Sequence, residues 1–390
     1  MRTVAVVLGT RPEAIKLALP IRALQEDPRF HPVIISTGQH RQMLDDTLRA
    51  FDLTPDIDLE IMAPKQTLPQ TTYRSLRRLE KELTHLRAEA LLVHGDTATT
   101  LAGALAGFHH QIPVVHVEAG LRSGFLHSPF PEEGNRRLVA QISALHLAPT
   151  PGNRTNLLQE GIADESIVVT GNTVIDALRW AGGREDGFGD PALADLHEDP
   201  RRIVVASAHR RDAWPHLPGI AQAFADIADE PEVRVVVPLH RNPAVREAML
   251  PRIGGHPNIT VVDPLPYLNY CRLTRRADIL LSDSSGAQEE GPALGKPTLV
   301  ISDVTERSEA VVAGTARLVG TRRAGIVEET LRLLRDQDVY QEMATTANPY
   351  GDGRATRRTV DALAHFFGDG PPADPFVPAG AGADLTMEMT

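Results

Sequence analysis

The sequence is poor in several features that would mark particular classes of protein. Among its 390 residues there is one cysteine, Cys271, so no disulfide can form within the chain and no cysteine cluster can bind zinc. No apolar run approaches the ~18 residues of a membrane span. The apolar stretch at the N-terminus ends at Gly9, too early for a secretory signal. We therefore expect a cytoplasmic protein that does not act at a membrane.

Positive charge is also scarce relative to negative charge. The chain has 40 Lys and Arg residues against 51 Asp and Glu residues, which gives a formal net charge of −11. Nucleic acids and anionic membranes are bound by basic surfaces, so neither is an expected partner. An anionic small ligand would have to be bound by a local group of donors.

Short apolar runs alternate with longer amphipathic segments in two successive blocks. The apolar runs are continuous in Val, Ile and Leu, as buried parallel strands are. Examples are residues 3–9, 31–37, 89–96 and 113–120 in the first block, and 201–209, 233–240, 277–283 and 297–303 in the second. The alternation predicts an α/β fold with two doubly wound domains.

Composition predicts where these domains begin and end. We expect the first domain over residues 1–180 and the second over residues 201–353. The segment 181–200 is rich in Gly, Asp and Pro, which is typical of a linker. Residues 369–390 are rich in Pro, Gly and Ala without periodicity, which predicts a disordered tail.

In the first block, charged residues gather where the predicted strands end, which is where such sheets bind ligands. They are Arg11 and Lys16 in GTRPEAIK (9–16), Asp96 in HGDT (94–97), Glu118 in HVEAG (116–120), and Glu132 and Arg136 in PEEGNRR (131–137). Cations near a helix N-terminus oppose the helix dipole and favour phosphate binding. Carboxylates that converge raise each other's pKa, which suits proton transfer near neutral pH. Taken alone, an Asp after a strand more commonly caps the following helix, and a charge run such as that at Glu132 is usually a solvated first turn.

In the second block, His209 and His240 end two predicted strands, and each is followed by an arginine. No H-E-x-x-H pattern or cysteine partner supports a metal site, so contact with a diphosphate fits these histidines better. A third strand is followed by DSSGAQEEGPALGKP (283–297), in which a Ser/Gly turn opens a helix. Such a turn attracts phosphate, whereas Glu290, further into the helix, would accept hydrogen bonds from a ribose diol. These features predict a nucleoside diphosphate with its sugar.

Many spaced motifs occur here in one order, and together they resemble those of the non-hydrolysing UDP-N-acetylglucosamine 2-epimerases. They include GTRPEAIK, TGQHRQML, HGDT, HVEAGLRSG, PFPEEGNRRL, AHRR, PLHRNP and DSSGAQEEGPALGKP, and the match runs from about residue 3 to 365. The resemblance implies a GT-B fold, with two Rossmann-like domains facing across a cleft and a last helix, at about 354–368, packing on the first. It implies reversible C2 epimerisation of UDP-GlcNAc to UDP-ManNAc, without a cofactor or metal, in a homodimer. The implied route is elimination of UDP to 2-acetamidoglucal and readdition.

The resemblance also implies roles for individual residues. The implied catalytic residues are Asp96, Glu118, Glu132 and His209, and which carboxylate removes the C2 proton is left open. The residues implied to bind UDP and sugar are Arg11, Lys16, Arg136, His240, Tyr270, Ser284, Ser285, Gly286, Glu290 and Arg307. In the bacterial branch a second UDP-GlcNAc activates the enzyme, at positions that correspond to Gln39, His40, Gln42, Arg74 and Arg210.

Some positions depart from the family's pattern. Ser285 stands where glycine is usual, Ser302 and Ser308 replace an arginine and a proline, and Asp212–Ala213 follows the HRR sequence. Two alternative functions share many of these features. One is a GT-B glycosyltransferase, which would need an acceptor pocket, and the other is a UDP-sugar sensor that binds without turnover.

Overall fold

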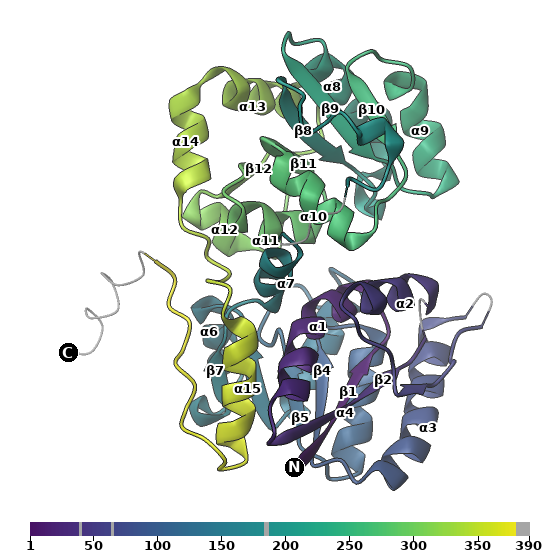
Figure 1. Ribbon diagram of the computed structural model, residues 1–390, viewed down its shortest axis with the longest axis vertical. Helices are drawn as coiled ribbons and strands as arrows, with labels where there is room; N and C mark the ends of the chain where they lie inside the picture. Colours follow the sequence, from purple (N-terminus) through teal and green to yellow (C-terminus); the bar gives the residue numbers. More distant parts are fainter. Residues whose placement is uncertain (39–40, 64–65, 183–186, 380–390) are drawn as a thin grey trace. The chain divides into compact units, whose positions relative to one another are not determined.

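The computed structural model describes residues 1–38, 41–63, 66–182 and 187–379, and the chain divides into two compact units (Figure 1). The first unit comprises Met1–Ala177 and Gly351–Pro378, and the second is built from Leu178–Tyr350. Each unit has one parallel sheet with helices on both of its faces (Figure 1). The predicted fold class, α/β with two doubly wound domains, is confirmed.

The first unit contains a seven-stranded sheet in the order β3-β2-β1-β4-β5-β6-β7. Every residue from Val4 to Leu8 in the central strand is at most 1% exposed, because helices cover both faces of the sheet. The strands are β1 (Arg2–Leu8), β2 (Phe30–Ser36), β3 (Ile57–Asp58), β4 (Ala90–His94), β5 (Val114–Val117), β6 (Leu145–Ala148) and β7 (Ile167–Val169). The helices are α1 (Arg11–Glu26), α2 (Arg41–Ala50), α3 (Leu68–Leu86), α4 (Ala98–His109), α5 (Glu132–Ile142), α6 (Pro151–Gln159) and the 3₁₀ helix η1 (Asp164–Ser166).

The second unit contains a six-stranded sheet in the order β10-β9-β8-β11-β12-β13. Its strands are β8 (Arg202–Ser207), β9 (Val233–Pro238), β10 (Ile259–Val262), β11 (Ile279–Ser282), β12 (Thr298–Val300) and β13 (Ala316–Leu318). Its helices are α8 (Leu217–Ala228), α9 (Pro243–Ile253), α10 (Tyr267–Arg276), α11 (Ser285–Ala293), α12 (Ser308–Ala313), α13 (Arg323–Arg335) and α14 (Gln337–Thr345), with the 3₁₀ helices η2 (Pro191–Leu193) and η3 (Arg211–His216). In both sheets the strand order reverses beside the first strand of the unit, and loops that leave strand ends at such a point form the ligand sites of this architecture.

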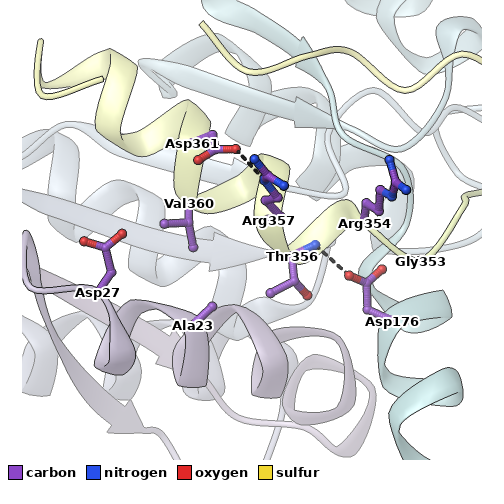
Figure 2. Close-up of a pocket in the computed structure, with 9 residues that line it drawn as sticks. All are labelled: Ala23, Asp27, Asp176, Gly353, Arg354, Thr356, Arg357, Val360 and Asp361. Atoms are coloured by element: carbon purple, nitrogen blue, oxygen red, sulfur yellow. Dashed lines mark hydrogen bonds and ion pairs between the residues drawn. The ribbon is translucent and has the colours of Figure 1, made fainter. Parts of the chain in front are cut away.

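The chain passes from the first unit to the second within α7 (Thr173–Ala181), and α15 (Ala355–Phe366) belongs to the first unit and packs on α1. Asp176 of α7 caps α15, because its carboxylate accepts hydrogen bonds from the N–H groups of Ala355 at 3.2 Å and Thr356 at 2.8 Å. Figure 2 shows this carboxylate facing Thr356 in a pocket that Ala23 of α1 also lines. A contact 179 residues apart in sequence therefore fixes the start of α15.

Two segments differ from the expectation that they lack packed structure. In the predicted linker 181–200, Phe188, Leu193 and Leu196 are buried in the core of the second unit. In the tail predicted to be disordered from residue 369, Phe376 is 4% exposed and its N–H donates to the carbonyl of Val169 at 2.8 Å. Composition missed both because a few apolar side chains among Gly and Pro are enough to anchor a segment. Residues 183–186 and 380–390 lie outside the described part of the chain. No helix in the described ranges is both long and apolar enough to cross a membrane.

Candidate functional site

Glu118 lies at the carboxyl end of β5 in an unusual backbone conformation. Its φ is 63°, in the left-handed region, where a non-glycine residue costs about 1–3 kcal/mol and where functional residues are concentrated. Its carboxylate forms an ion pair with the Nζ of Lys16 from α1, and the Nε2 of His94 lies 3.6 Å from the same oxygen. The side chains of Lys16 and Glu118 are 9% and 10% exposed, so this carboxylate is held in one place by its surroundings.

Asp96, which follows β4, is held from α5. Arg136 donates to its Oδ2 through Nε, at 3.1 Å, and through Nη2, while the Nδ2 of Asn135 donates to its backbone carbonyl at 2.7 Å. Arg136 also lies 3.3 Å from the Oε2 of the buried Glu133. Asp96 is not the cap of α4, because the Oγ1 of Thr97 accepts the hydrogen bond from the N–H of Thr100. The expectation that Asp96 caps α4 is therefore wrong.

The charges of the first unit differ from the expected group of converging carboxylates. Glu118 and Asp96 each face a cation, and these cations, Lys16 and Arg136, are two of the residues expected at the diphosphate. Tertiary packing thus matches opposite charges that the linear sequence only showed to be near strand ends. Glu132 begins α5 and Arg11 begins α1, and both are partly exposed.

Glu13 was missed by the sequence reasoning, although it determines what the start of α1 can bind. It is 2% exposed, and its Oε2 accepts hydrogen bonds from the N–H groups of Gly9 and Thr10, both at 2.7 Å. These N–H groups lie at the helix start where the sequence suggested phosphate binding by Arg11 and Lys16. The Thr10-x-x-Glu13 spacing is that of a capping box, and it was the available signal.

In the second unit, His209 and His240 lie at the ends of the adjacent strands β8 and β9. Their rings stack, with centroids 5.5 Å apart and planes 5° from parallel. Burial and the neighbouring His209 lower the pKa of His240, so the neutral ring is favoured there. The two histidines expected from the sequence are thus brought into direct contact.

Asp283, the first residue of the DSSG segment, orients His209. Its Oδ1 lies 3.2 Å from the Nδ1 of His209, and its Oδ2 accepts from the N–H groups of His209 at 2.6 Å and Arg210 at 2.8 Å. The side chain is 1% exposed. Since Oδ1 makes no hydrogen bond to the described residues, Asp283 acts on His209 through its backbone N–H and leaves the ring beside the carboxylate. The sequence analysis missed this aspartate because it interpreted the segment only as a turn for phosphate and a glutamate for ribose.

Helix α11 begins at Ser285, directly after the turn that follows β11. Ser284 makes no side-chain cap, and no side chain of the described residues accepts a hydrogen bond from the N–H groups of Ser285 and Gly286. A Cβ at Gly286 would meet only the Oγ of Ser284, at 3.7 Å, so the turn is uncrowded. Helix α11 therefore presents the kind of N-terminus that accepts an anion.

The two glutamates of α11 have separate surroundings. Glu289 is buried and accepts a hydrogen bond from the Nε of Arg307 at 3.1 Å, while the Nη1 of Arg307 donates to Glu306 at 2.6 Å. Arg307 was expected at the diphosphate, but in this structure it is buried and engaged by these carboxylates. Glu290 is 6% exposed, and Tyr270 of α10 packs partly buried against the core of the second unit.

The departures from the family's pattern have local explanations. Ala213 of η3 is buried in the core, and the indole Nε1 of Trp214 donates to the carbonyl of His209 at 3.1 Å, so the loop after His209 is anchored. The Oγ of Ser302 donates to the carbonyl of Val304 at 2.8 Å. Ser308 is the first residue of α12, and Ser285 is partly exposed at the first position of α11.

The expected activator residues are described only in part. Gln39 and His40 lie outside the described residues, as does the side chain of Gln42. Arg74, on α3, donates from Nη1 to the carbonyl of Ile61 at 3.3 Å. Arg210 precedes η3 in the second unit. Within the described ranges no group of three or more His, Cys, Asp or Glu side chains could hold a metal ion.

Comparison with known proteins gives consistent matches over nearly the whole chain. A family model described as UDP-N-acetylglucosamine 2-epimerase matches residues 22–364. The UDP-N-acetylglucosamine 2-epimerase of Escherichia coli K12 is 47% identical over 367 residues, covering 92% of this chain and 98% of that protein. The protein of that name from Bacillus subtilis 168 is 45% identical, covering 94% and 96%.

Solved structures agree with these relatives. The Staphylococcus aureus MnaA–UDP co-structure has a TM-score of 0.89 at 39% identity and covers 97% of this chain and 100% of that one. The UDP-GlcNAc 2-epimerase of Neisseria meningitidis, bound to UDP-GlcNAc, has a TM-score of 0.87 at 40% identity, covering 94% and 100%. A glycosyltransferase of kitacinnamycin, at 12% identity and a TM-score of 0.63, shares the GT-B type of fold alone.

Proposed function

The chain belongs to the UDP-N-acetylglucosamine 2-epimerase family, and from this premise we propose that it is an isomerase that interconverts UDP-GlcNAc and UDP-ManNAc. The observation that carries the proposal is that the two units contain different polar groups, which suit the two halves of this reaction. The first has carboxylates at strand ends, each paired with a cation, and the second has a stacked histidine pair and an uncapped helix start. Proton transfer and diphosphate binding are the two requirements of this reaction. Relatives solved with UDP and with UDP-GlcNAc support the same ligand here.

The reaction proceeds by elimination and readdition. A base removes the proton at C2 while the C1–O bond breaks, the electron pair leaves with UDP, and 2-acetamidoglucal remains. Return of the proton to the opposite face of C2 and attack of the UDP oxygen on C1 give the epimer. Asp96, Glu118, Glu132 and His209 supply the acid and base groups for the two faces. The ion pairs of Glu118 with Lys16 and of Asp96 with Arg136 hold two of these groups in defined orientations.

The departing UDP is stabilised by groups that favour negative charge. The N–H groups at the start of α11, from Ser284 to Gly286, and the ring of His240 bind the diphosphate, with Arg11, Lys16 and Arg136 adding positive charge. Glu290 accepts hydrogen bonds from the ribose diol. Tyr270 stacks on the uracil. Arg307 contributes through Glu289, whose charge it neutralises beside the helix.

Proton exchange at C2 is the direct test. Incubation of the protein with UDP-GlcNAc in D2O, followed by NMR, should show deuterium entering C2 as UDP-ManNAc appears. Binding of UDP-GlcNAc without exchange would contradict the proposal and indicate the sensor. Release of free ManNAc and UDP would indicate a hydrolysing enzyme, and transfer of the sugar to an acceptor would indicate a glycosyltransferase.

We further propose that the protein is a homodimer and that UDP-GlcNAc activates it through Arg74 and Arg210. Sedimentation velocity tests the dimer. Initial rates with UDP-ManNAc alone and with added UDP-GlcNAc test activation, which predicts stimulation. A full rate with UDP-ManNAc alone would contradict it.

A further inference from the structure

The buried carboxylate of Glu13 in α1 is bound entirely by hydrogen-bond donors. Its Oε2 accepts from the N–H groups of Gly9 and Thr10, at 2.7 Å each, and from the Oγ1 of Thr10 at 3.0 Å. Its Oε1 accepts from the Oγ1 of Thr97 at 2.6 Å. All of these neighbours are hydrogen-bond donors, which matches a carboxylate, whose oxygens accept. Within the described part of the chain its hydrogen bonds come from backbone N–H and hydroxyl groups, and no cation forms an ion pair with it.

The two oxygens of Glu13 bind two different loops. Oε2 binds the loop after β1, and Oε1 binds Thr97 in the loop after β4, 84 residues away. Thr97 directly follows Asp96 and is the N-cap of α4. The carboxylate therefore connects the start of α1 to the residue beside a candidate catalytic acid.

Close packing of the same loops is an independent observation. A Cβ at Gly9 would lie 2.1 Å from the Oγ1 of Thr37 and 2.5 Å from the Oγ1 of Thr99, which are themselves hydrogen-bonded at 3.1 Å. The loop after β1 is thus packed closely against Thr37, which follows β2, and against Thr99 in the first turn of α4. This packing places the loop after β1 against the same helix start that Thr97 caps.

An ordinary capping box explains only half of these contacts. In that motif the glutamate binds the backbone N–H of its own N-cap residue, which is the work of Oε2 here. The bond from Oε1 to Thr97 has no part in capping α1. We propose that Glu13 is a positioning residue, which joins the loops after β1 and β4 and thereby holds Asp96 in register with α1. The catalytic consequence rests on the proposed epimerase function, whereas the structural bridge does not.

Glu13→Gln tests the bridge. Glutamine is the other residue that serves in a capping box, so its oxygen retains the bonds to the loop after β1, but its NH2 group replaces the acceptor for Thr97. We expect kcat to fall by about 10- to 100-fold, since displacements near 1 Å have such effects, with KM and the Kd of UDP changed less than about twofold. Amide hydrogen exchange over residues 96–100 should become at least about tenfold faster.

A matched pair at Thr97 tests the bridge from the other side. Thr97→Asn retains an oxygen that caps α4 and an NH2 group that donates to Glu13. Thr97→Asp retains the cap but opposes one carboxylate to another. We expect the Asp variant to reproduce the effects of Glu13→Gln on kcat and on exchange, and the Asn variant to show much smaller effects. This pair also keeps the test valid if Glu13→Gln does not fold.

Asp336→Ala controls for the loss of a helix cap elsewhere. Asp336 caps α14 in the second unit, accepting from the N–H groups of Asp338 and Val339 at 3.1 Å each. This variant should lower Tm without changing kcat or exchange over 96–100. Unchanged exchange over 96–100 in Glu13→Gln, or equal behaviour of the two Thr97 variants, would overturn the bridge. The two proposals can fail separately. Faster amide hydrogen exchange over 96–100 in the variant would support the bridge, even if the wild type shows no deuterium exchange at C2 and so contradicts the epimerase proposal.

Discussion

The starts of helices α1 and α11 have similar patterns of residues but differ in whether a side chain accepts hydrogen bonds from their first N–H groups. Both follow a strand and a short turn of small residues, and both have a glutamate within the first five helical positions. In α1, Glu13 turns back and occupies the N–H groups of Gly9 and Thr10. In α11, Glu289 pairs with Arg307, and no described side chain accepts from the first N–H groups. A helix start binds phosphate only where the chain's own carboxylates have other partners.

The same contrast extends to the two units. Strand ends in the first unit carry opposite charges already matched to each other, such as Lys16 with Glu118. Strand ends in the second unit carry the stacked pair His209 and His240 beside a helix start without a side-chain cap. The first arrangement suits proton transfer by oriented groups, and the second suits an anionic ligand. Three predictions test this division, and a fourth concerns a further helix start.

The largest effect is expected from the matched pair of the first unit. Glu118→Gln should lower the rate of C2 deuterium exchange about 10³-fold, because a positioned acid–base group contributes on the order of 10²- to 10⁴-fold. It also leaves the buried Lys16 without this partner, so Glu118→Gln/Lys16→Met should recover stability but not exchange. The UDP affinity of the single variant Glu118→Gln, measured by calorimetry, should change little. Exchange within tenfold of wild type would remove Glu118 from the catalytic residues.

Arg307→Met tests the ion pair between Arg307 and Glu289, which keeps the Glu289 carboxylate away from the first N–H groups of α11. Since the side chains of Arg307 and Glu289 are 8% and 3% exposed, the substitution removes this cation from a buried carboxylate and should lower the free energy of unfolding by about 3–5 kcal/mol. Addition of Glu289→Gln should restore most of this loss in urea unfolding. UDP affinity of the double variant then reports any direct contact of Arg307 with UDP. A loss below about 1 kcal/mol would show that the pair is unimportant for stability.

Gly286→Asp would place a carboxylate in the first turn of α11, as Glu13 does in α1. We expect the Kd of UDP to rise about 30-fold, close to 2 kcal/mol, because a fixed anion competes for the helix start. Gly286→Asn is the matched neutral control, with an expected change below about threefold, since the site accommodates a Cβ. Equal affinities for the two variants in isothermal titration would place the diphosphate elsewhere.

The smallest effect concerns a third helix start, that of α15. Burial raises the pKa of Asp176 above its ordinary value of 3.8. The folded state therefore binds this proton more tightly than the unfolded state, and the resulting stability is present below pH 3.8 and is lost as pH rises through the raised value. Asp176→Asn should flatten this part of the stability–pH curve and change stability at pH 7 by less than about 1 kcal/mol, because the amide oxygen still caps α15. Parallel curves for variant and wild type from urea unfolding between pH 4 and 7 would contradict this assignment.

The sequence predicted the strands and the residues at their ends, but not how those residues pair. Asp96, Glu118, His209 and His240 all lie at strand ends as expected. Glu13 escaped notice because the capping-box spacing of Thr10 and Glu13 was not considered, and Asp283 because its segment was interpreted as a site for phosphate and ribose. The buried segments around Leu193 and Phe376 escaped for a related reason, since composition averages over the few apolar side chains that anchor them.

The sequence by itself determined two parallel α/β units, because uninterrupted apolar runs can be buried only as covered strands, and it determined which residues stand at the ligand-binding edge of each sheet. Only the tertiary structure decided which charges are matched. Lys16 and Glu118 are 102 residues apart, and Glu13 and Thr97 are 84 apart, so their contacts depend on strand order and on close packing between loops. Hydrogen bonds and ion pairs act over a few ångströms, and at such separations in sequence that proximity is a property of the fold.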